Sequence, residues 1–61
     1  MKEKIKALIA EKILEQGRIN IVMKNLSIMD MLDNNTLNQY LQDKENLEQD
    51  IIKLKQILKS L

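Results

Sequence analysis

The stretch DNNT at residues 33–36 divides the chain into two halves, and each half carries a helical pattern of apolar residues. Asparagine adopts the left-handed backbone conformation at low cost, so a helix can end at this stretch. Thr36 and Gln39 have the spacing of a capping box, which satisfies two backbone donors at the start of a new helix. We therefore expect the chain to reverse direction here and to form a helical hairpin.

Composition supports helices in both halves. The chain has no proline, one glycine and one aromatic residue, and it is rich in Leu, Ile, Lys, Glu and Gln. Such a composition favours long helices over sheet. We predict an all-α protein with a single domain over residues 1–61. Its first helix should cover about residues 2–32, its turn residues 33–36 and its second helix about residues 37–60.

The second half has the seven-residue repeat of a coiled-coil seam, interrupted at Lys44. Acidic side chains precede lysines along this half, which is the order that the helix dipole favours. We expect the seam to form the contact surface of the hairpin and of its dimer. The seam residues are Leu37, Tyr40, Leu47, Ile51, Leu54, Leu58 and Leu61.

The first half allows two interpretations, because Gly17 is a poor helix former and could bend or break the helix. Ser27 and Asp30 could also cap a separate short helix. We favour one long helix, since the apolar residues stay in register across Gly17. One face then carries Ile5, Leu8, Ile9, Ile19, Val22, Met23 and Leu26, and a second face carries Ala10, Ile13, Leu14, Ile21, Ile28, Met31 and Leu32.

A helix with two apolar faces needs two packing partners. The second helix of the chain supplies one, and a second copy or a different protein must supply the other. A chain of 61 residues buries only about 60% of its unfolded surface. Without cysteine or histidine it lacks disulfides and the commonest zinc ligands, so oligomerisation is the remaining means of stabilisation.

Charge is distributed unevenly along the chain. Residues 1–24 carry six basic and three acidic side chains, residues 25–50 carry one basic and six acidic, and residues 51–61 carry three lysines. A hairpin gathers the basic ends at one pole and the acidic turn at the other. Two hairpins packed antiparallel would place unlike charges together. We therefore expect an antiparallel dimer that resembles a four-helix bundle.

The sequence offers little for catalysis. Hydroxyl groups occur only at Ser27, Thr36, Tyr40 and Ser60, and no histidine or cysteine is present to build a nucleophile and its base. The chain has no glycine-rich phosphate loop. We expect a protein that is not an enzyme, with no catalytic residue, no metal site, no cofactor and no small-molecule substrate.

These features lead us to expect a small regulatory or adaptor protein that dimerises and binds another protein. The first basic stretch is followed by an apolar run too short for a signal peptide or a membrane span, so we expect a cytoplasmic protein without a membrane partner. Methionine offers a flexible apolar contact surface. The residues expected to bind the partner are Ile21, Ile28, Met29, Met31 and Leu32.

Two alternatives remain open at this point. A dimer could gather basic side chains into a site for RNA or DNA, although the chain is nearly neutral and has one aromatic residue for stacking. The chain could also be a structural subunit of a larger assembly. The residues that could bind an anion are Lys2, Lys4, Lys6, Lys12 and Arg18.

In outline, a hairpin of about sixty residues that pairs into four helices resembles the Rop family of plasmid copy-number RNA-binding proteins. The resemblance concerns architecture, because no motif residues are shared. It implies an all-helical dimer and identifies no site residue in this chain.

Overall fold

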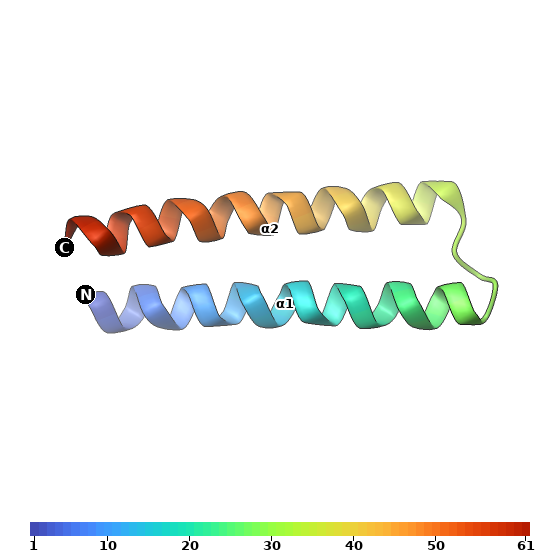
Figure 1. Cartoon of the computed structure of the whole chain (residues 1–61), viewed down its shortest axis with the longest axis horizontal. Coiled ribbons are helices and arrows are strands. Elements are labelled where there is room, and N and C mark those ends of the chain that lie inside the picture. Colours follow the sequence, from blue (N-terminus) through green and yellow to red (C-terminus); the bar gives the residue numbers. More distant parts are fainter.

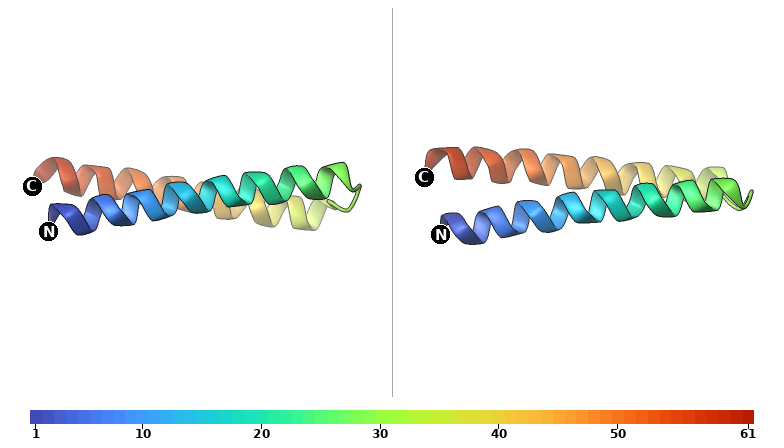
Figure 2. Two further views of the ribbon diagram at one scale, coloured as in Figure 1. Left: turned by 90° about the horizontal axis from the view of Figure 1, so that it is seen from below. Right: turned by 60° about the horizontal axis from the view of Figure 1, so that its bottom comes forward.

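The protein is a two-helix antiparallel hairpin in a computed structural model that describes residues 1–61. Helix α1 covers Lys2–Ile28 and helix α2 covers Asn34–Ser60. The two helices run side by side along their whole length, and the chain termini lie together at the end opposite the turn (Figure 1). Two further views show the helices crossing at a shallow angle (Figure 2). The rod measures 46 × 15 × 10 Å.

Helix α1 is continuous through Gly17. No proline interrupts it, and Gly17 has an ordinary helical backbone without positive φ. The apolar residues that contact α2 keep one register on both sides of the glycine. The expectation of one long helix is therefore confirmed, and the alternative of two short helices is wrong.

Helix α1 ends at Ile28, about four residues earlier than its sequence predicts. Asp30 adopts a left-handed backbone with φ 57°. The Met31 N–H donates to the carbonyl of Leu26 at 2.8 Å, and the Asp30 N–H donates to the carbonyl of Ser27 at 3.1 Å. This pair of bonds is a Schellman motif, which satisfies carbonyls at a helix end. Aspartate tolerates the left-handed region better than most residues, so it can end a helix where glycine is absent.

Asp33 caps the start of α2. Its Oδ1 accepts a hydrogen bond from the Thr36 N–H at 2.7 Å, and its carbonyl accepts from the Leu37 N–H at 2.9 Å. The helix therefore begins at Asn34, and the expected capping box at Thr36 and Gln39 is wrong. A carboxylate is the stronger acceptor for a backbone N–H, and it also interacts favourably with the positive end of the helix dipole.

The cap makes a pH-dependent contribution to stability. The hydrogen bond from the Thr36 backbone, followed by one from its side chain, lowers the pKa of Asp33 below its ordinary value. A carboxyl whose pKa falls on folding contributes stability above its unfolded pKa, and this is lost as the pH falls through the folded pKa. Asp33→Asn keeps a capping oxygen without that titration. We expect the midpoint temperature of thermal unfolding, measured by circular dichroism, to fall between pH 6 and pH 3 in both proteins. The fall should be smaller in Asp33→Asn than in wild type. An equal fall in both proteins would contradict this role.

The core lies near the chain termini and away from the turn. Ile5 and Ile9 of α1 are buried against Ile51 of α2, and Leu54 and Leu58 pack against this cluster. These are the only three buried residues, and no buried polar side chain accompanies them. The accessible surface of 4949 Å² exceeds the roughly 4,100 Å² expected for a compact 7.2 kDa protein. The hairpin therefore leaves much apolar surface uncovered.

Candidate functional site

The face of α1 that contacts α2 follows a seven-residue repeat that contains two polar positions. Lys12 and Gln16 lie at the middle of this repeat, and both are half-buried. The Lys12 ammonium lies 3.3 Å from the Asp50 carboxylate, and Gln16 Nε2 donates to Glu48 Oε2 at 3.0 Å. These contacts link the two helices at the solvent-exposed edge of their interface. The buried or half-buried side chains of the repeat are Ile5, Ile9, Lys12, Gln16, Ile19, Met23 and Leu26.

The seam expected in α2 faces α1 over most of its length. Ile51 is 3% exposed, and five other seam residues are half-buried. Lys44, which interrupts the apolar repeat, is half-buried as well. Leu61 follows the last helical residue and is 53% exposed. The half-buried seam residues are Leu37, Tyr40, Leu47, Leu54 and Leu58.

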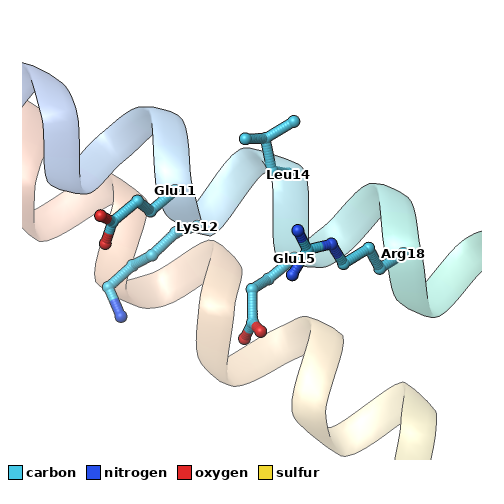
Figure 3. A pocket seen from close by; sticks show the side chains of 5 residues that line it. All are labelled: Glu11, Lys12, Leu14, Glu15 and Arg18. Atoms are coloured by element: carbon cyan, nitrogen blue, oxygen red, sulfur yellow. The ribbon is translucent and has the colours of Figure 1, made fainter.

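A second apolar stripe runs along α1 on the side that α2 leaves uncovered. Its large side chains are spaced seven residues apart, with Leu14, Ile21 and Ile28 exposed by 63%, 61% and 73%. Leu14 projects from α1 away from α2 (Figure 3). Gly17 lies between Leu14 and Ile21, Ala10 lies one turn before Leu14, and Lys24 lies between Ile21 and Ile28. We call this set the outer stripe, and it consists of Ala7, Ala10, Leu14, Gly17, Ile21 and Ile28.

The corresponding side of α2 is polar. Its outward positions, also seven residues apart, hold Gln42, Gln49 and Gln56, all exposed. The exposed apolar residues of α2, Ile52 and Ile57 among them, do not form a repeat of this kind. The asymmetry places the uncovered apolar surface of the hairpin mainly on α1.

A shallow hollow of about 270 Å³ borders the outer stripe at Leu14. Its other lining residues are Glu11, Lys12, Glu15 and Arg18, which surround the leucine with both signs of charge (Figure 3). The hollow is open, and its lining mixes one apolar side chain with charged ones. Such a surface suits a side chain of a protein better than a buried small molecule, for which pockets are more enclosed and more apolar.

The outer stripe meets two exposed methionines at the turn. Met29 and Met31 are each 61% exposed, next to the exposed Ile28. We call these three residues the turn patch. Four of the five residues expected to bind a partner are thus exposed. The fifth, Leu32, is half-buried in the turn.

The five basic residues considered for anion binding do not share one side of the hairpin. Their sequence positions distribute them around α1. Lys6 lies 3.9 Å from a carboxylate oxygen of Glu3, and Lys12 is paired with Asp50 as described above. No observation in the structure therefore favours nucleic-acid binding through Lys2, Lys4, Lys6, Lys12 and Arg18.

Other chemical groups are sparse. The Ser60 hydroxyl donates to the carbonyl of Gln56 at 3.1 Å, and Thr36 belongs to the cap of α2. No three acidic side chains lie close enough together to hold a metal ion. Neither helix contains an apolar stretch long enough to cross a lipid bilayer. Comparisons with protein-family models, curated proteins and solved structures gave no match.

Four residues of the outer stripe, Ala7, Ala10, Leu14 and Gly17, were not among those expected to bind a partner. They occupy the part of the stripe farther from the turn, whereas the predicted partner-binding residues lie nearer the turn. Their signal is the seven-residue spacing that links Ala7 to Leu14, Ile21 and Ile28. The polar residues Lys12 and Gln16 in the contact face of α1 were not predicted there, because an apolar repeat does not identify polar members of a contact face.

Proposed function

We propose that this protein is a small non-enzymatic regulatory or adaptor protein that dimerises and acts by binding another protein. The outer stripe carries this proposal. Its large residues are more than half exposed, although α1 already uses its other apolar face to pack on α2. Large apolar side chains exposed along one side of a helix indicate a site of protein interaction.

Self-association accounts for part of the uncovered surface. Two hairpins that pair antiparallel form an assembly of four helices, in which each acidic turn lies beside the basic pole of the other copy. The isolated hairpin has only three buried residues, so it stands to gain stability from a second apolar interface.

The turn patch is the surface proposed for the other protein. Ile28, Met29 and Met31 are exposed beside a tight turn, and unbranched methionine side chains adapt to partners of different shape. Binding at both ends of a dimer would let the protein bridge two partner molecules or occlude a surface on one. The mechanism therefore needs no chemistry beyond recognition.

The double substitution Met29→Asp with Met31→Asp tests the turn patch. Both side chains are exposed, so the hairpin should keep its helicity while partner binding is lost, because a buried carboxylate without a counter-charge is costly. The immobilised protein is incubated with cell extract in 0.1 M and 1 M salt, and retained proteins are identified by mass spectrometry. We expect a protein retained at both salt concentrations by wild type and lost by the double variant.

Gln42→Asp with Gln49→Asp provides the matched control on α2, where two exposed residues at outward positions acquire the same charge. This control should retain the partner. Equal retention by all three proteins would overturn the assignment of the turn patch. A partner released by 1 M salt would indicate an electrostatic contact instead of an apolar one.

A further inference from the structure

We propose that the outer stripe of α1 binds the outer stripe of a second copy of the chain in a defined antiparallel register. In this register Leu14 of one copy packs on Gly17 of the other, and Ile21 packs on Ala10. This inference rests on the proposed function, which includes a dimer, and adds detail to that dimer. It specifies which helices meet, in which direction and at which residues.

The order of large and small side chains selects the antiparallel direction. The outer stripe follows the spacing of a coiled-coil seam, with large residues at Leu14, Ile21 and Ile28 and small ones at Ala10 and Gly17. In an antiparallel pair the two kinds of seam position face each other, so Leu14 meets Gly17 and Ile21 meets Ala10, while Ile28 lies opposite Glu3 at the end of the overlap. In a parallel pair each position meets itself, which sets Gly17 against Gly17 and leaves space unfilled.

Gly17 supports the same arrangement. A Cβ placed on this residue would meet nothing within 4 Å, and its φ is not positive. Neither the backbone nor the packing of the hairpin therefore requires glycine here, although glycine is a poor helix former. A second helix that approaches closely at this position does require a small residue. The open space at Gly17 is what Leu14 of the second copy would fill.

Charges beside the stripe are complementary in this register. Glu11 and Arg18 flank Leu14 on the same side of α1. The antiparallel register places Glu11 of each copy beside Arg18 of the other, so the pair forms twice. It also brings Lys2 and Lys4 close to the acidic turn of the second copy. A parallel arrangement would gather the lysines of both copies at one end.

The geometry of α1 determines the shape of the dimer. The outer stripe lies about 150° around the helix from the face that contacts α2. The two α1 helices therefore meet at the centre, and each α2 lies on the outside, which gives a row of four helices. The overlap ends near Ile28, so Met29 and Met31 project at both ends and remain free for another protein.

Paired cysteines test the register, since the chain has no cysteine of its own. In Ala10→Cys with Ile21→Cys, the two positions lie about 16 Å apart along one helix. A disulfide within one chain would need Cα atoms closer than about 7 Å. Any link between tryptic peptides 7–12 and 19–24 must therefore join two copies. We expect this link after mild oxidation, and we expect no disulfide dimer from either single-cysteine variant.

Sedimentation equilibrium of the unmodified wild type, over a concentration series up to 100 µM, is measured in parallel. A dimer together with the 10-to-21 link supports the proposal. Links from 10 to 10 and from 21 to 21 would show a parallel pair and overturn it, as would a dimer without any of these links. A wild-type monomer at every concentration would overturn self-pairing. Retention of another protein by the turn patch is measured separately, so it can succeed or fail independently of these results.

Discussion

Replacing Ile51 with alanine is expected to remove a large part of the free energy of unfolding of the isolated hairpin. Ile51 is the most buried residue, at 3% exposure, and it joins Ile5 and Ile9 in the core. Truncating a buried isoleucine to alanine costs about 2–5 kcal/mol. A domain of this size has a free energy of unfolding of only about 3–9 kcal/mol. Urea and thermal unfolding, followed by circular dichroism at 222 nm, would measure the loss.

Ile52→Ala is the matched control for this experiment. It makes the same chemical change at the next position along α2, where the side chain is 47% exposed. Its free energy of unfolding should change by no more than about 0.5–1 kcal/mol, because less apolar contact is lost. If the two variants were equally destabilised, the core would not be centred on Ile51, and the register of the helices described here would be incorrect.

Replacing Gly17 with leucine is expected to affect the hairpin and the dimer in opposite directions. Leucine favours a helix interior by nearly 1 kcal/mol relative to glycine, and the space around Gly17 is open within one chain. The helicity of the monomer should therefore rise. In the proposed dimer the new side chain would collide with Leu14 of the second copy. We expect the dissociation constant to increase at least 100-fold, as measured by sedimentation equilibrium.

Gln49→Leu controls for the added apolar side chain. Gln49 is exposed at an outward position of α2, which the proposed dimer leaves free. The dissociation constant of this variant should remain within about threefold of wild type. An unchanged dissociation constant in Gly17→Leu would place the interface on another face. A fall in monomer helicity would show that Gly17 serves the hairpin itself.

Most of the fold is predictable from the sequence. The helical patterns on either side of residues 33–36 predicted an antiparallel hairpin, and the register of apolar residues predicted that α1 continues through Gly17. The boundaries of the two helices at the turn were harder to predict. Ser27 and Asp30 have the spacing of a helix start, yet Asp30 takes a left-handed backbone that ends α1. Asp33 and Thr36 are both suitable N-cap residues for α2. The hydrogen bond from the Thr36 N–H to Asp33 Oδ1 shows that Asp33 is the cap.

The candidate site was predictable in outline. Periodicity alone indicated a second apolar face on α1, and the structure shows large side chains exposed along it. The methionines near the turn are the larger apolar signal, whereas the middle of that face is marked only by a glycine between two large residues, Leu14 and Ile21. Lys12 and Gln16 were not anticipated in the contact face, because their aliphatic stems pack while their polar ends reach carboxylates of α2.

The position of the core also affects how the chain can fold. Ile9 and Ile51 are 42 positions apart, so a long loop must close before the most favourable apolar contacts form. Zippering from the turn meets half-buried residues first and then the polar pairs at Lys12 and Gln16. The contacts that stabilise the hairpin most therefore form late. We infer that folding of one chain is slow for a helical protein of this length. A second chain that holds α1 straight would shorten this search, which links the folding of each copy to the presence of the other.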